Sequence, residues 1–242
     1  MATVNKLVPP FDVEKVLEYA CRTGNEHVKK SIDLIVECMK EVNFDREQFC
    51  VSFNGGKDCT ALLHLVYSVY AKNVKLDSSN VAINCLTIEM PDTFDELKQF
   101  VNSSIVWYNL HLLKVDGPDF KKALNLVKND KKGQHFRFIY MGTRSSDTRA
   151  SHLKPIQDTD AGWPSFTRVF PLLHWTYHQV WSFLRENNVP YCSLYDIGYT
   201  SLGQVSNTSR NPKLRLVSST GEERYMPAYM LEDGDEERTP RQ

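Results

Sequence analysis

The chain has 242 residues, of which 41% are hydrophobic, and its formal net charge is −1 at pH 7. This length and apolar content suffice for an ordinary buried core, and the balanced charge excludes a general attraction to nucleic acid or to anionic membranes. No stretch approaches the roughly 18 apolar residues of a membrane span, and the N-terminal residues do not form a secretory signal. We therefore expect a cytoplasmic monomer that binds neither nucleic acid nor membrane.

The six cysteines do not form a metal or redox motif. No two of them stand in a Cys-x-x-Cys pair, which argues against a zinc knot and against a thioredoxin-like centre. Cys50 and Cys85 lie within apolar runs, as expected for small buried side chains in a reducing compartment.

The predicted elements begin with two helices and continue as alternating strands and helices. Apolar residues from Val13 to Ala20 share one helical face, and residues 32–39 repeat the spacing. Strands are then predicted at 48–53, 81–88, 110–115 and 136–141, with helices around 62–69, 93–108 and 118–130 between them. Such alternation predicts an α/β fold with an open, mostly parallel twisted sheet and helices on both faces.

After residue 142 the pattern changes. Residues 143–166 are polar and predict a long irregular loop, a feature that is usually functional when it lies inside a compact domain. Thr176 and Gln179 form a capping box that begins one more helix, which must end before Pro190. Composition alone predicts that the charged tail, residues 232–242, is a solvated run.

Residues 52–58, directly after the first predicted strand, have the composition of a phosphate-binding loop. They are Ser52, Phe53, Asn54, Gly55, Gly56, Lys57 and Asp58. Glycines let the backbone approach an oxyanion, the start of the following helix offers unpaired N–H groups, and Lys57 adds a positive charge. Asp58 suits a helix start and is also a candidate Mg²⁺ ligand. The alternative is a plain Gly-Gly turn capped by Asp58, with Lys57 in solvent.

The spacing within this loop excludes the common phosphate loop. That motif places a glycine where this chain has Val51 and a hydroxyl residue where it has Asp58. The stretch resembles instead the Ser-x-Gly-Gly-x-Asp loop of the PP-loop ATP pyrophosphatases, which split ATP between its α- and β-phosphates. This resemblance implies that the loop holds the departing pyrophosphate, with the Asn54 amide as a donor to phosphate.

Further candidate residues follow the other strands, because parallel sheets bind ligands outside the carboxyl ends of their strands. Glu89 follows the second predicted strand, and Gly142, Arg144 and Asp147 follow the fourth. Arginines beside a carboxylate, including Arg149, suit a charged ligand. The alternative is a surface loop with compensating charges.

Two residues of the long loop have side chains that suit a flat heterocycle. Trp163 can stack on a ring, and Asp160 can accept a hydrogen bond from a ring N–H. Core packing is the usual alternative for a single tryptophan.

An ordered set of motifs closely resembles the eukaryotic FAD synthases, FMN adenylyltransferases built on a PAPS-reductase-like domain. The motifs after the glycine loop are Gly142-x-Arg-x-x-Asp147, Leu153-Lys-Pro-Ile-Gln-x-Thr-Asp-x-x-Trp-Pro164, Pro171-Leu-Leu-His-Trp175, Tyr199-Thr-Ser-Leu-Gly203 and Pro227-Ala-Tyr-Met-Leu231. The resemblance implies one synthase domain over residues 1–242. N-terminal helices (1–45) precede a nucleotide-binding core (46–142), and flavin-binding loops and a C-terminal arm that contacts flavin and ATP follow (143–242).

The resemblance also implies a reaction. AMP passes from ATP to the phosphate of FMN by direct attack on the α-phosphorus, which yields FAD and pyrophosphate with the help of Mg²⁺. Asn54, Asp58, Arg238 and Arg241 match catalytic positions. The expected ATP site comprises Ser52, Phe53, Asn54, Gly55, Gly56, Lys57, Asp58 and Glu89, and the expected flavin site comprises Gly142, Arg144, Asp147, Asp160 and Trp163.

Three other interpretations remain open at this point. A sulfonucleotide reductase needs a nucleophilic cysteine near the C-terminus, whereas the last cysteine here is Cys192. A pyrophosphatase that activates tRNA would need a basic, aromatic-rich surface, and the sequence has none. A non-enzymatic flavin or nucleotide binder would keep Trp163 and Asp160 without needing Asn54, Asp58 and the two arginines of the tail.

Overall fold

The computed structural model describes residues 12–74, 81–117, 119–148 and 150–241. Its helices are α1 (Val13–Ala20), α2 (Glu26–Glu41), α3 (Lys57–Val74), α4 (Asp95–Trp107), α5 (Phe120–Asn129) and α6 (Tyr177–Glu186). Its strands are β1 (Phe49–Ser52), β2 (Ile83–Glu89), β3 (Leu110–Asp116), β4 (Phe138–Tyr140), β5 (Ile156–Asp158), β6 (Thr167–Val169), β7 (Arg215–Val217) and β8 (Glu223–Tyr225).

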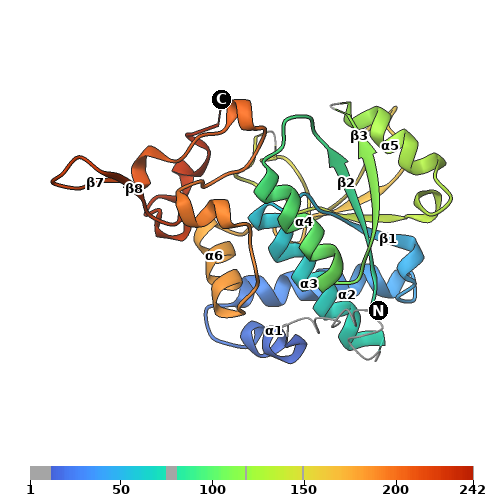
Figure 1. Ribbon diagram of the computed structural model, residues 1–242. Coiled ribbons are helices and arrows are strands. Elements are labelled where there is room, and N and C mark those ends of the chain that lie inside the picture. Colours follow the sequence, from blue (N-terminus) through green and yellow to red (C-terminus); the bar gives the residue numbers. More distant parts are fainter. Residues whose placement is uncertain (1–11, 75–80, 118, 149, 242) are drawn as a thin grey trace, which may run out of the picture.

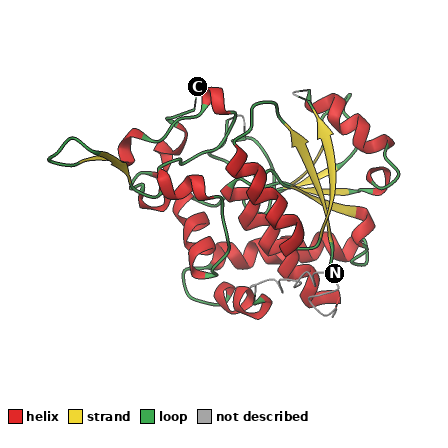
Figure 2. Cartoon of the chain, viewed as in Figure 1, coloured by secondary structure: helices red, strands yellow, loops and turns green. Residues whose placement is uncertain are grey.

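Six of these strands form one sheet in the order β3-β2-β1-β4-β6-β5 (Figures 1 and 2). All neighbouring pairs are parallel except β5 and β6, which are antiparallel. The chain thus moves outward from β1 to β2 and β3, and then returns past β1 to β4. This reversal leaves the carboxyl ends of β1 and its neighbours open to a ligand.

The sheet carries a hydrophobic layer on each face. In β1, Phe49 and Val51 face a large core that includes residues of α1, α2, α3, α4 and α6, whereas Cys50 faces a smaller core with α5. This alternation follows from the period-two geometry of a strand. Figure 1 shows α5 on the side of the sheet opposite to the other helices. The predicted open α/β sheet with helices on both faces is therefore confirmed.

Helix ends follow from the side chains beside them. Asp12 accepts from the backbone N–H of Glu14 at 3.0 Å, which caps α1. The capping box predicted at Thr176 and Gln179 is confirmed: each side chain bonds to the backbone of the other residue, at 3.2 and 2.9 Å. These contacts satisfy N–H groups that a helix start leaves without partners.

The structure corrects the sequence-based elements in two places. Residues 143–169, predicted to be irregular up to 166, contain β5 and β6, and residues 215–225 form a β7–β8 hairpin that projects from the body (Figure 2). Each of these strands has only three residues, too few for a period-two pattern to stand out. The helix predicted near 118–130 begins at Phe120 among the described residues.

Three smaller expectations concern membranes, cysteines and domains. Within the described residues, no helix is both long enough and apolar enough to cross a membrane. All six cysteines are free, and Cys50 and Cys85 are fully buried as predicted. The division into one domain with three parts stays a prediction.

We predict that acid weakens the fold through His64. Burial lowers the pKa of His64 from 6.5 to about 3, and its Nδ1 lies 3.0 Å from the Tyr108 hydroxyl. Below pH 6.5, His64 is therefore protonated in the unfolded chain but stays neutral in the native chain. The unfolding free energy consequently falls as the pH drops below 6.5. Between pH 7 and pH 5 this one group should cost about 2 kcal/mol of unfolding free energy.

Urea unfolding at the two pH values measures this loss. A His64→Gln variant, which has no proton to accept in this range, serves as the comparison. Its unfolding free energy should fall less than that of the wild type between pH 7 and pH 5. Equal losses in the two proteins would contradict the assignment to His64.

Candidate active site

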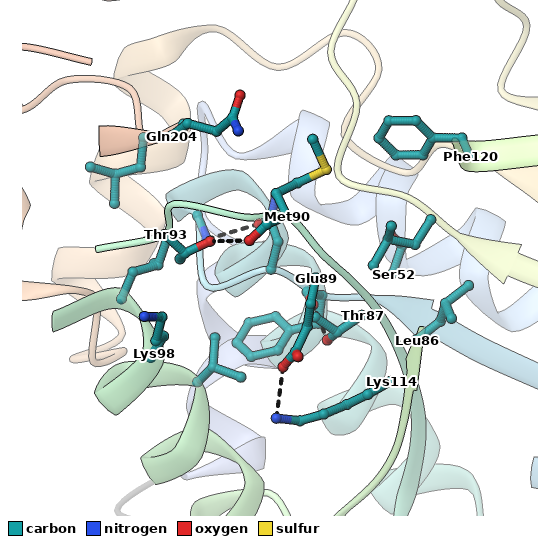
Figure 3. A pocket seen from close by; sticks show the side chains of 18 of the residues that line it. Ser52, Leu86, Thr87, Glu89, Met90, Thr93, Lys98, Lys114, Phe120 and Gln204 are labelled. Atoms are coloured by element: carbon teal, nitrogen blue, oxygen red, sulfur yellow. Dashed lines mark hydrogen bonds and ion pairs between the residues drawn. The ribbon is translucent and has the colours of Figure 1, made fainter. Parts of the chain in front are cut away.

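A cavity of about 570 Å³ opens at the carboxyl ends of β1, β2 and β3 (Figure 3). Its wall also includes residues from the first half of α4, from the start of α5, and from residues 202–207 and Arg241 far along the chain. The volume lies within the usual range for small-molecule sites. This position agrees with the expectation that a ligand binds outside the carboxyl ends of the parallel strands.

Several residues predicted from the sequence line this cavity. They are Ser52, Phe53, Asn54, Gly56, Glu89 and Arg241. Glu89 forms an ion pair with Lys114 of β3 at 2.8 Å, shown as a dashed line in Figure 3. In that view Phe120 stands on one side of the pair, and Thr93 and Gln204 stand on the other.

Sequence reasoning missed Lys114, Lys98, Thr93, Phe120 and Gln204, which also line the cavity. Lys114 could have been predicted, because it lies near the carboxyl end of a strand that pairs in parallel with β2. Gln204 gave no such signal. Its contact with the carbonyl of Pro91, at 3.1 Å, joins residues 113 positions apart.

The glycine loop has a tightly packed backbone. Gly55 has φ +79°, and a side-chain carbon there would lie 2.8 Å from a methyl group of Leu97 in α4. The Gly56 N–H donates to the Asn54 side-chain oxygen, and the Lys57 N–H donates to the Tyr195 hydroxyl, both at 2.9 Å. Two N–H groups that a phosphate would need are thus paired within the protein, and Asn54 keeps its NH₂ group for other partners.

Lys57 is buried, with 2% of its surface exposed, so the alternative that placed it in solvent is wrong. Its Nζ lies 3.0 Å from Asp58 Oδ2 and 2.9 Å from Glu237 Oε2. Glu237 belongs to the 3₁₀ turn η8 (Gly234–Arg238) and is itself 3% exposed. The charged tail is therefore not a solvated run at this point, because it folds back onto the start of α3.

These contacts extend into an ionic cluster, which we define as Lys57, Asp58, Arg144, Asp147, Glu237 and Arg238. Arg144 Nε lies 2.8 Å from Asp58 Oδ1, and the same guanidinium pairs with Glu237. Arg238 lies 2.7 Å from Asp147 Oδ1. Three cations thus meet three carboxylates, which is the condition under which charges are tolerated in a protein interior.

Asp58 stays ionised in this cluster. Burial by itself raises the pKa of a carboxyl group, but the charges of Lys57 and Arg144 outweigh burial and hold the pKa of Asp58 below its ordinary value. Both carboxylate oxygens already have a cationic partner. No group of three or more His, Cys, Asp or Glu residues suited to a metal occurs in the described part of the chain. As it is arranged here, Asp58 does not fit a metal ligand.

Arg241 differs from the arginines of the cluster. It lines the cavity, and its guanidinium donates a hydrogen bond to Ser201 Oγ at 3.4 Å. Among the described residues no carboxylate forms an ion pair with it. Burial, followed by the charge of Arg238, lowers the pKa of Arg241, yet an arginine stays protonated at neutral pH. The cavity therefore offers a cation without a carboxylate partner among the described residues, and an anion would stabilise it.

The residues predicted for flavin fall into two groups. Gly142, Arg144 and Asp147 lie beside the start of α3, where a side-chain carbon on Gly142 would come within 2.9 Å of the Cys59 nitrogen. Arg144 is 2% exposed, so it does not belong to a surface loop. Arg149 lies outside the described residues.

Asp160 and Trp163 lie apart from that group, between β5 and β6 at the edge of the sheet. Asp160 pairs with Arg168 at 3.4 Å, and Trp163 keeps 39% of its surface exposed. Trp163 therefore does not pack in the core, and its ring is accessible to a ligand. The flavin roles of both residues stay predictions.

Comparison with known proteins defines the class. Residues 48–210 match the model of the phosphoadenosine phosphosulfate reductase domain, and the chain belongs to that family. Within it, the chain belongs to the FAD synthase family. It is 42% identical over 211 residues to the "Probable FAD synthase" of Caenorhabditis elegans, which covers 86% of this chain and 39% of that protein. The corresponding protein of Schizosaccharomyces pombe is 38% identical over 202 residues, with 82% and 73% covered.

A solved structure agrees over nearly the whole chain. The FMN adenylyltransferase of Candida glabrata, in complex with FMN and the ATP analogue AMPCPP, is 27% identical with a TM-score of 0.81. The match covers 95% of this chain and 94% of that one. This chain spans about two fifths of the length of its C. elegans relative, so the activity of that whole protein is not carried over by the match alone.

We predict that Gly203 seats Arg241. A side-chain carbon at Gly203 would lie 2.8 Å from the Arg241 guanidinium, the mobile end of a long side chain. A Gly203→Ala variant should therefore fold normally but push Arg241 out of place. Its affinity for ATP, measured by calorimetry, should drop about tenfold, as expected when one charged hydrogen-bond donor is misplaced.

An Arg224→Ala variant is the matched control, since Arg224 is an exposed arginine of the β7–β8 hairpin. It should bind ATP as the wild type does. Wild-type affinity in Gly203→Ala would show that Arg241 does not bind the nucleotide.

Proposed function

We propose that this chain is an FMN adenylyltransferase. It transfers AMP from ATP to the phosphate of FMN, and it releases FAD and pyrophosphate. Membership among the FAD synthases supports this proposal, as does the likeness to an adenylyltransferase solved with FMN and an ATP analogue. The single observation that carries it is the cavity at the strand ends, which joins the glycine loop to an arginine without a carboxylate partner among the described residues.

ATP would occupy this cavity with its phosphates toward the glycine loop. Asn54 and Gly56 line that end, and α3 begins directly behind it with the positive pole of its dipole. Arg241 enters the cavity from the C-terminal arm, which we define as residues 232–241. The apolar wall formed by Leu86, Ile88 and Leu97 suits an adenine ring.

The chemistry needs positioning and charge stabilisation more than acid–base catalysis. The phosphate of FMN is already ionised at neutral pH, so it needs no general base to attack the α-phosphorus. Negative charge then grows on the oxygen that bridges to the departing pyrophosphate. Arg241 and the Asn54 amide are the groups of this chain aimed at such charge, and donors fixed in advance stabilise it without reorganisation.

FMN would approach from the side of Trp163 and Asp160. The loop that carries them rests on α5, where Lys128 Nζ donates to the Ser165 carbonyl at 3.2 Å. The first residue of α5, Phe120, lines the cavity. This continuity supports a flavin ring near Trp163 and a phosphate directed toward ATP.

Mg²⁺ would serve by neutralising the triphosphate when it is bound. The present contacts of Asp58 do not favour it as a ligand, since each of its oxygens pairs with a cation. A cytoplasmic location and a monomeric state likewise remain part of the proposal.

A sulfonucleotide reductase is the poorer alternative. Its reaction needs a reactive thiolate, whereas Cys192 is fully buried and burial raises its pKa.

Turnover with ATP, Mg²⁺ and FMN tests the function and the role of Asn54 together. The wild type should produce FAD and pyrophosphate in equal amounts, measured by chromatography and by a coupled pyrophosphate assay. Asn54→Ala should lower kcat on the order of 10²-fold, the usual effect of losing one charge-stabilising donor. Asn102→Ala, an amide of the same cavity on α4, should keep most of the activity. If the wild type adenylates another acceptor but not FMN, the proposal fails.

Asp160→Ala tests the flavin side separately. Losing a hydrogen bond to a ring N–H should raise the KM for FMN about tenfold and leave the KM for ATP nearly unchanged. Asp158→Ala, which removes an exposed carboxylate two residues earlier, is the matched control. A rise in the KM for ATP alone would refute this division of the site.

A further inference from the structure

Glu237 occupies a position in which an anionic ligand would be expected. Its carboxylate lies between two buried cations, Lys57 at 2.9 Å and Arg144 on the other oxygen. Arg238 Nε approaches the same carboxylate at 3.7 Å. Lys57 follows the glycine loop directly, so this internal anion sits next to the proposed pyrophosphate site.

The arm that carries Glu237 is held by contacts that do not involve its carboxylate. The Thr200 hydroxyl donates to the Glu237 backbone carbonyl at 2.7 Å, and the Asn211 amide donates to the Glu236 carbonyl at 3.0 Å. Thr208 also forms a β-bridge with Arg241. The carboxylate is therefore not required to dock the arm. Docking does not explain why a charged side chain is buried at this position.

That explanation lies in the charge balance of the ionic cluster. Three cations, Lys57, Arg144 and Arg238, face three carboxylates, Asp58, Asp147 and Glu237. Without the charge of Glu237 the cluster would carry one unit of positive charge beside the phosphates. A buried uncompensated cation attracts an anion strongly, because little water screens it.

We propose that Glu237 is a positioning residue that acts through Lys57 and Arg144. It fixes the charged ends of both side chains and neutralises them, so that pyrophosphate is bound weakly enough to leave after the transfer. The inference rests on the proposed function, since it takes pyrophosphate as the leaving group. It assigns to Glu237 a role in product release, which often limits the turnover of such enzymes.

A Glu237→Gln variant of the full chain tests this role, because it keeps the shape of the side chain and removes its charge. Calorimetric titration with inorganic pyrophosphate should give a Kd on the order of tenfold lower than that of the wild type, the effect of one added charge near an anion. The kcat for FAD formation should fall as release slows, while the KM for FMN stays unchanged. An unchanged or higher Kd for pyrophosphate would overturn the inference.

Two further variants separate charge from structural damage. Glu237→Asp keeps the charge on a shorter side chain and should return the pyrophosphate Kd toward the wild-type value. Glu232→Gln removes the same charge from an exposed site on the same arm and should change nothing. A merely structural role predicts the opposite sign, since a loosened arm would weaken pyrophosphate binding.

Glu237→Ala carries the same test if the glutamine variant does not fold. It should bind pyrophosphate more tightly than the wild type in a formate-free buffer, and added formate should reverse the gain by replacing the missing carboxylate. No gain, or no effect of formate, overturns the inference.

The two proposals fail in different ways. A wild type that forms no FAD, together with tighter pyrophosphate binding by Glu237→Gln, refutes the proposed function and leaves the charge role of Glu237. A wild type that forms FAD, together with unchanged pyrophosphate binding by the variant, refutes only the inference about Glu237.

Discussion

Two buried cations, Lys57 and Arg144, hold three distant parts of the chain together. Lys57 begins α3, Arg144 follows β4, and both share the carboxylate of Glu237 in the C-terminal arm. Charges at this depth are tolerated only when each has a partner, and removing one partner from such a network is far more costly than the pair is stabilising. These ion pairs join the arm to the start of α3, in addition to the hydrogen bonds from Thr200 and Asn211 that hold its backbone.

Because the ionic cluster is neutral, it also determines which charged side chain remains available to a ligand. Because its cations and carboxylates satisfy one another, Arg241 is the arginine of the arm that meets the cavity without a carboxylate partner among the described residues. Gly203 makes room for its guanidinium, and Gly55 lets α4 close over the loop. Small residues and paired charges thus leave Arg241 available at the position where phosphates are expected.

Local patterns were enough to predict the part of the site that is local. A strand, two glycines and a helix follow one another within residues 49–74, and both the loop and its place at a strand end were correctly predicted. Glu237 could not be found in this way, because its partners are 180 and 93 positions away in the chain. Composition even suggested that it was solvated. The strands β5 and β6 were not predicted, because three residues are too few to show the period-two alternation of a strand.

The central claim is that ATP is cut between its α- and β-phosphates and that FMN accepts the adenylate. Turnover of ATP labelled separately at the α- and at the β-phosphorus, with FMN present, tests it most directly. The account predicts that the α label appears in FAD and that the β label appears only in pyrophosphate. Release of the γ-phosphate as orthophosphate with ADP left behind, or an α label found in free AMP and not in the flavin, would contradict it.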